Sequence, residues 1–126
     1  MRSTSIQMIM AVVVASVALL SASQAKPDAS RGRELFDKRC TGCHALDGVK
    51  VGPRLRPVYG RSVGKDAQFP YSDALKASHV TWDETTLDKW LADPDSLIPG
   101  NDMSFRLENA AERADIIAYL KQLGGK

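Results

Sequence analysis

Two cysteines three residues apart, followed at once by a histidine, constrain this chain more than any other feature. They form the pentapeptide Cys-Thr-Gly-Cys-His at positions 40 to 44. On a helix, residues i, i+3 and i+4 share one face, so Cys40, Cys43 and His44 can approach the same partner. This spacing is typical of c-type haem attachment, in which two thioether bonds hold the porphyrin and the imidazole ligates its iron.

The CxxC part of the motif also occurs in thioredoxin-like redox pairs, short disulfides and zinc sites. A zinc site is disfavoured because the chain has only these two cysteines and one other histidine, His79, which we expect at the surface. A thiol oxidoreductase needs a strand before the motif, and nothing between Lys26 and Arg39 resembles a strand. Haem attachment is therefore the favoured interpretation.

The first 25 residues resemble a secretory signal peptide. Arg2 precedes an apolar run from Ile6 to Ala22, and the small residues Ser23 and Ala25 suit a small-x-small cleavage site. A membrane anchor is the alternative, since the run approaches the lower limit of a spanning segment. Cleavage after Ala25 would leave residues 26–126 as one domain in an oxidising compartment.

The formal net charge of +2 is small and argues against a nucleic-acid ligand. The charges are unevenly distributed, with ten Lys or Arg against four Asp or Glu in residues 26–65, and six against eleven in residues 66–126. A basic half around the haem motif can steer an acidic redox partner towards it. A solvated surface without that role explains the same distribution.

Helix signals occur at both ends of the predicted domain. Asp28 or Ser30 can begin a helix that continues to about Arg39, where the haem motif starts. The glycines and prolines of residues 47–65 predict a loop. Ser72 predicts one short helical turn that continues to Lys76.

Two further helices are predicted in the second half of the chain. Thr81 and Glu84 have capping-box spacing, and an apolar face follows until Pro94 stops the helix. Asn109 and Glu112 have the same spacing before the last helix, which Gly124 and Gly125 end. No segment alternates as a strand does, so the predicted fold class is all-α.

An iron atom bound by His44 leaves a sixth coordination position. The methionines are Met1, Met8, Met10 and Met103, so signal cleavage would leave Met103 as the only thioether. Met103 follows Pro99 and Gly100 in a predicted loop, which is an unusual place for a methionine that only fills a core. Met103 is therefore the candidate sixth ligand.

Residues that match a known family pattern follow one another along the whole predicted domain. They are Gly32, Phe36, the CxxCH motif, Gly52, Pro53, Leu55, Gly60, Arg61, Gly64, Tyr71, Ser72, Ala74, Trp82, Leu87, Leu91, Pro94, Pro99, Gly100, Met103, Phe105 and residues 113–120. Together they resemble the class I cytochromes c, specifically the mitochondrial cytochrome c and bacterial cytochrome c2 group. The resemblance implies an all-α cytochrome c fold of about four to five helices around one covalently attached haem c.

The resemblance also implies roles for single residues. Pro53 should accept the proton of His44 Nδ1, and Gly32 should meet Tyr119 where the first and last helices cross. A second set should donate hydrogen bonds to the haem propionates, namely Arg61, Tyr71, Ser72, Trp82 and Asn101. A third set should complete the haem-binding residues, namely Leu55, Trp90 and Phe105.

Three positions depart from the mitochondrial pattern. Leu75 stands where much of that group has an asparagine near an inner propionate, and Trp90 where it has a tyrosine close to the methionine ligand. Asp102 stands where the mitochondrial proteins have a lysine, which weakens the basic patch around the haem edge. We therefore do not expect the mitochondrial partners to apply to this chain.

The expected function is that of a soluble periplasmic one-electron carrier and not of an enzyme, because two protein ligands leave no open iron position. Its expected partners are redox proteins, a donor dehydrogenase or complex and a terminal oxidase, reductase or reaction centre, at least one of them membrane-bound. The chain itself is expected to be a monomer. One alternative is a peroxidase-like haem enzyme or a sensor in which Met103 is displaced. Another is a thiol-disulfide oxidoreductase that uses Cys40 and Cys43.

Overall fold

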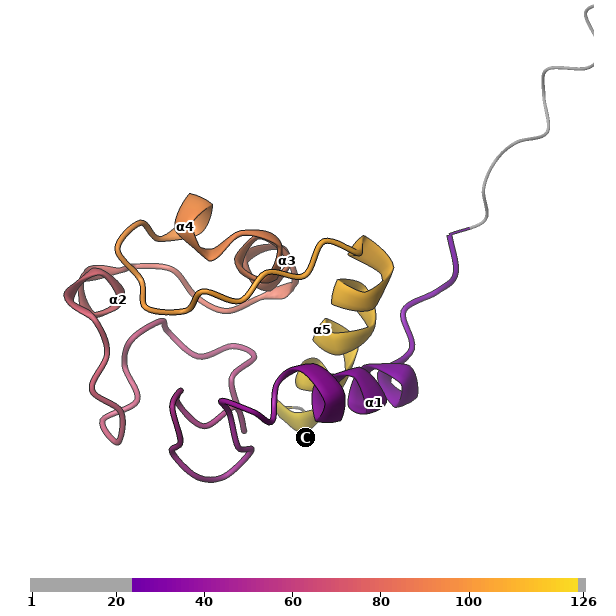
Figure 1. Ribbon diagram of the computed structural model, residues 1–126, viewed down its shortest axis with the longest axis horizontal. Coiled ribbons are helices and arrows are strands. Elements are labelled where there is room, and N and C mark those ends of the chain that lie inside the picture. Colours follow the sequence, from indigo (N-terminus) through magenta and orange to yellow (C-terminus); the bar gives the residue numbers. More distant parts are fainter. Residues whose placement is uncertain (1–23, 125–126) are drawn as a thin grey trace, which may run out of the picture.

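The computed structural model describes residues 24–124, which form five helices and no sheet (Figure 1). The helices are α1 (Ala29–Arg39), α2 (Asp73–Ala77), α3 (Glu84–Ala92), α4 (Pro94–Leu97) and α5 (Ala110–Gly124). Helices α1 and α5 cross at one end of the molecule, and the long segment between α1 and α2 winds along the side opposite α3 and α4. The predicted all-α class is confirmed.

The predicted signal peptide lies almost entirely outside the described residues, as does Gly125 at the other end. None of the helices in the described part of the chain is both long and apolar enough to span a bilayer.

Three helices begin as the sequence predicts, at residues whose side chains bind free backbone amides. Asp28 Oδ1 accepts from the amides of Ser30 at 2.8 Å and Arg31 at 3.3 Å. Ser72 Oγ accepts from the amide of Leu75 at the start of α2, 3.3 Å away. Asn109 Oδ1 accepts from the backbone amides of residues 111 and 112 of α5, at 2.9 and 3.1 Å.

The predicted capping box of α3 was wrong. The capping residue is Asp83 and not Thr81, because the Asp83 carboxylate accepts from the Thr86 amide while Thr86 Oγ1 accepts from the Asp83 amide, both at 2.8 Å. Pro94 also does more than stop α3, since it opens the short helix α4. The first position of a helix suits proline because an amide hydrogen there has no partner within the helix.

The crossing of α1 and α5 depends on the absence of a side chain at Gly32. A Cβ atom there would overlap the carbonyl oxygen of Asp115 and lie 3.0 Å from Tyr119 Cβ. Beside this contact, the rings of Phe36 and Tyr119 meet edge to face with their centroids 5.5 Å apart. The contact between Gly32 and Tyr119 that the resemblance implied is therefore present.

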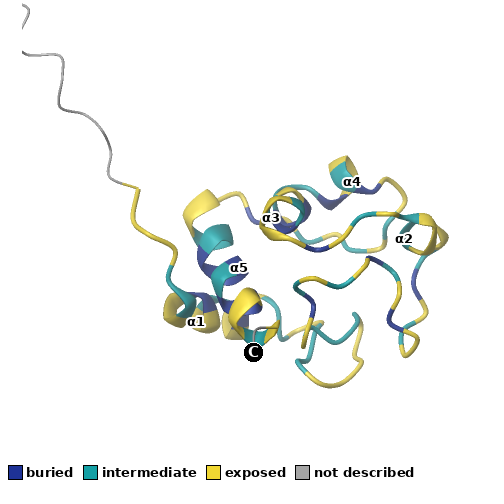
Figure 2. Cartoon of the chain, turned by 180° about the vertical axis from the view of Figure 1, so that it is seen from behind, coloured by how far each residue is buried: buried dark blue, intermediate teal, exposed yellow. Residues whose placement is uncertain are grey.

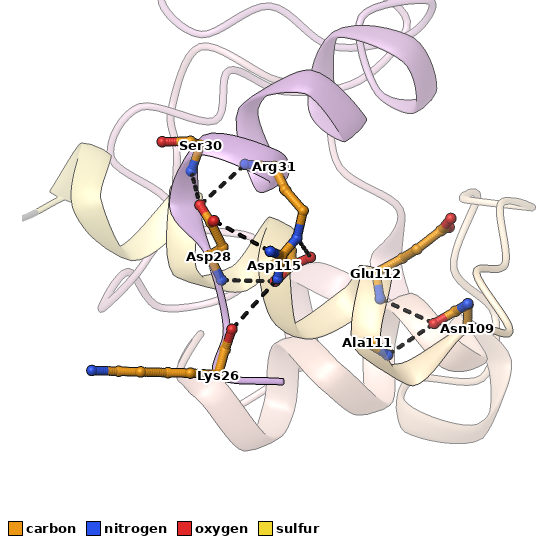
Figure 3. A network of polar contacts seen from close by, with 8 residues as sticks. All are labelled: Lys26, Asp28, Ser30, Arg31, Asn109, Ala111, Glu112 and Asp115. Carbon is orange, nitrogen blue, oxygen red and sulfur yellow. Dashed lines mark hydrogen bonds and ion pairs between the residues drawn. The ribbon is translucent and has the colours of Figure 1, made fainter. Parts of the chain in front are cut away.

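A buried carboxylate joins the same two helices (Figure 3). Asp115 on α5 accepts from the Asp28 amide at 2.7 Å and from Arg31 Nε at 3.0 Å. Burial tends to raise the pKa of Asp115, but the hydrogen bonds from Arg31 and Asp28 outweigh burial and hold this pKa below its usual range. The carboxylate is therefore ionised and paired where the helices meet.

The residues coloured as buried in Figure 2 lie mainly on α1, α3 and α5 and in the loops between the helices. The apolar members of this core are Phe36, Val58, Val63, Tyr71, Trp82, Leu87, Trp90, Leu91, Ile98, Leu107, Ile116, Ile117, Tyr119 and Leu120.

We predict that Gly32→Ala lowers the free energy of unfolding by about 1–3 kcal/mol, because the new methyl group forces α1 away from α5. Denaturant titration of the haem-bound protein measures this change. Gly48→Ala is the matched control, since a Cβ at Gly48 meets no atom within 4 Å. Equal unfolding midpoints for the two variants would contradict the close crossing.

Candidate haem site

The CxxCH motif occupies a tight turn that continues from the end of α1. The amide of Cys40 still binds the carbonyl of Phe36, at 2.9 Å. The amides of Cys43 and His44 then both donate to the Cys40 carbonyl, at 3.1 and 2.9 Å. The turn brings both thiols and the imidazole to the lining of one cavity.

The cysteine environment does not suit a thiol redox centre. Cys43 is exposed and Cys40 is half-buried. Burial raises the pKa of the Cys40 thiol to about 11, whereas redox-active cysteines have lowered pKa values that favour the thiolate. In addition, the element before the motif is the helix α1 and not a strand.

The imidazole of His44 is oriented by the carbonyl of Pro53. The distance from His44 Nδ1 to this oxygen is 2.8 Å, so the contact implied by the resemblance is present. A carbonyl only accepts, so Nδ1 carries the proton and the lone pair of Nε2 is free for a metal. Burial lowers the pKa of His44, which favours the neutral form that ligates iron.

Gly52 makes room for this imidazole. A Cβ atom at Gly52 would overlap the ring and come within 2.7 Å of Nδ1. The Gly52 amide also donates to the carbonyl of Cys43 at 2.8 Å, which joins the loop to the turn of the motif. A residue with a side chain at this position would push the ring away from Pro53.

The cavity beside the motif has a volume of about 270 Å³, and segments far apart in the sequence line it. Met103 lines it together with His44, so the structure brings both candidate iron ligands to the same cavity. The other expected site residues in its lining are Cys40, Cys43, Pro53, Leu55, Arg61, Tyr71, Ser72, Trp82, Trp90 and Phe105. Asn101 is the one expected site residue that does not line the cavity. Its side chain instead donates to the carbonyl of Ile98 and accepts from the amide of Met103.

The chemistry of the lining fits a haem. Trp82 is buried and lines the cavity. Its indole N–H can only donate, so it suits a ligand that brings acceptors, such as propionates. The Ser72 hydroxyl accepts from Leu75, which leaves its hydrogen free to donate. Burial raises the pKa of Tyr71, so its phenol also remains a donor.

Arg61 is held at the cavity by a pair of residues that the sequence analysis missed. Its guanidinium lies 3.4 Å from Asp66 Oδ2 and donates to the carbonyl of Arg54 at 3.0 Å. Asp66 is buried, and a 2.7 Å hydrogen bond from Arg54 lowers its pKa. Because Arg54 and Asp66 lie twelve residues apart in irregular chain, no periodicity could have revealed this pair.

A small helical protein whose CxxCH motif and methionine line one apolar cavity has the features of a haem-c-binding electron carrier. The family model for cytochrome c matches residues 29–124. The chain therefore belongs to the cytochrome c family, as a class I member that carries electrons, is not an enzyme and binds one covalently attached haem c.

Relatives agree with this membership over most of their length. Cytochrome c of Chlamydomonas reinhardtii is 46% identical over 99 residues, which cover 75% of this chain and 88% of that protein. Cytochrome c2 iso-2 of Magnetospirillum fulvum is 52% identical over 87 residues, which cover 67% of this chain and 91% of that protein. The solved structure of cytochrome cH from Methylobacterium extorquens is similar with a TM-score of 0.72 and 41% identity, and covers 75% of this chain and 98% of that one.

We predict that Gly52→Ala displaces the His44 ring, weakens its contact with Pro53 and lowers the free energy of unfolding of the haem-bound protein by about 1–3 kcal/mol. Chemical denaturation measures this loss. Gly42→Ala, within the motif, is the control because a Cβ at Gly42 meets nothing within 4 Å. If both variants were as stable as the wild type, Gly52 would have no role in placing the imidazole.

Proposed function

We propose that the chain is a soluble, monomeric one-electron carrier of the periplasm, with His44 and Met103 as the two axial ligands of its haem iron. One observation supports this proposal above others. The imidazole of the CxxCH motif and the thioether of Met103, 59 positions later, line the same cavity. The free lone pair on His44 Nε2, which follows from the Pro53 contact, supports the first of these ligands.

Two axial side chains leave the protein with little means of bond chemistry, since neither substrate nor oxygen has an open position. When bound, the haem supplies a one-electron couple between Fe(III) and Fe(II). The thioether of Met103 favours Fe(II) more than a second imidazole would, and so raises the reduction potential. The apolar lining around Leu55, Trp90 and Phe105 limits the access of water.

We further propose that Arg61, Tyr71, Ser72 and Trp82 hold the haem propionates. Each lines the cavity and carries a hydrogen-bond donor on its side chain. A propionate that leaves water is costly without such donors. The role proposed for Arg61 also agrees with the way Asp66 and Arg54 fix its guanidinium.

The proposed partners are a donor dehydrogenase or complex and a terminal oxidase, reductase or reaction centre, of which at least one is membrane-bound. A small and weak interface suits a carrier, because each partner must release it quickly. The excess of Lys and Arg in residues 26–65 favours acidic partner surfaces.

Export rests on the apolar segment and the small residues before Lys26. We predict that mass spectrometry of the protein from its own host finds an N-terminus at or near Lys26. A protein that retains Arg2 would contradict cleavage and support a membrane-anchored carrier.

We predict that Met103→Ala opens the sixth position, lowers the reduction potential and lets carbon monoxide or peroxide bind. Met103→His should keep the iron low-spin and also lower the potential, within the range of about 0.8 V that axial ligands span. Optical spectra and redox titration measure these effects. A wild-type protein that binds carbon monoxide readily at neutral pH, with a spectrum unchanged by Met103→Ala, would instead favour the peroxidase-like enzyme.

A further inference from the structure

The loop that carries Met103 begins with a tight turn at the end of α4. The Asn101 amide donates to the carbonyl of Ile98 at 3.3 Å, and Gly100 has a φ of 85°. Proline at the second turn position and glycine with positive φ at the third are features of a type II turn. The turn directs the chain back towards the cavity two residues before Met103.

The side chain of Asn101 connects this turn to Met103. Its Nδ2 donates to the Ile98 carbonyl at 2.9 Å and to Asp95 Oδ1 at 3.0 Å. Its Oδ1 accepts from the backbone amide of Met103 at 2.8 Å. An amide side chain meets both requirements at once because it carries a donor and an acceptor.

A second contact holds the loop on the other side of Met103. Arg106 Nη2 lies 3.4 Å from Asp95 Oδ2 and 3.0 Å from Asp93 Oδ1. Asp93 also accepts from the Ser96 hydroxyl at 2.8 Å, which fixes its carboxylate at the start of α4. Residues on both sides of Met103 therefore bind the same short helix, through Asp95.

We propose that Asp95, Asn101 and Arg106, here called the α4 clamp, are positioning residues for the sulfur of Met103. None of the three lines the cavity, so they act only through the backbone of the loop. The clamp limits how far the loop moves and thereby how readily another ligand replaces the sulfur. This inference rests on the proposed ligation by Met103.

The contacts of the clamp differ in strength. The two Asn101 bonds to Ile98 and Met103 are partly buried, where water competes less for the same groups. The ion pair of Arg106 with Asp95 is exposed, and such pairs contribute little because water and salt screen them. Asn101 should therefore contribute most to holding the Met103 loop in place, and Asp95 should contribute less.

Imidazole titration of the haem-bound full chain tests the clamp, because imidazole competes with the sulfur for the iron. We predict that Asn101→Ala raises the affinity for imidazole by about tenfold, and Asp95→Ala by about threefold. The weak far-red band of the oxidised protein, which reports sulfur bound to iron, should disappear at correspondingly lower imidazole concentrations. Asp95 is exposed, so its variant keeps the test available if Asn101→Ala does not fold.

Asp37→Ala is the matched control, because Asp37 is exposed on α1 and its side chain makes no hydrogen bond or ion pair with any described residue. It should bind imidazole as the wild type does. A merely structural role for the clamp would lower the denaturation midpoint and leave imidazole affinity unchanged, which would overturn the inference.

Met103→Ala separates the two proposals. If it removes the far-red band while Asn101→Ala and Asp95→Ala bind imidazole like the wild type, the clamp is wrong and ligation by Met103 stands. If Met103→Ala leaves both the band and the imidazole affinity unchanged, Met103 is not the ligand. The proposal that the α4 clamp positions its sulfur is then wrong as well.

Discussion

The close crossing of α1 and α5 is the contact on which the rest of the structure depends. Gly32 lets the two backbones approach, and the turn that carries Cys40, Cys43 and His44 starts where α1 ends. From the other helix, Ile116 and Leu120 line the same cavity as that turn. The helix contact thus sets where the haem-attachment motif lies relative to the opposite wall of the cavity.

Two buried carboxylates show how charge is accommodated around this small core. Asp115 joins α1 to α5 through Arg31, and Asp66 holds Arg61 at the cavity with the help of Arg54. In both cases hydrogen bonds hold the carboxyl pKa below its usual range despite burial. The first pair supports the fold, whereas the second places a cation where an anionic group of the cofactor is expected.

Much of the fold and of the site was predictable because it depends on local patterns. The CxxCH spacing, the capping residues Asp28, Ser72 and Asn109, and the isolated Met103 each carry their meaning within a few residues. The α3 cap was misassigned because Thr81 and Asp83 offer competing starts, and only the three-dimensional contact with Thr86 decides between them. Asn101 was expected at the propionates, but the position of Asp95 gives its amide other partners.

X-ray absorption at the iron edge of the oxidised, haem-bound protein tests the central claim most directly, because it counts the atoms bound to iron. Ligation by His44 and Met103 predicts one sulfur neighbour together with five nitrogens, four from the porphyrin and one from the imidazole. Either six nitrogen or oxygen neighbours without sulfur, or a five-coordinate iron, would contradict the account.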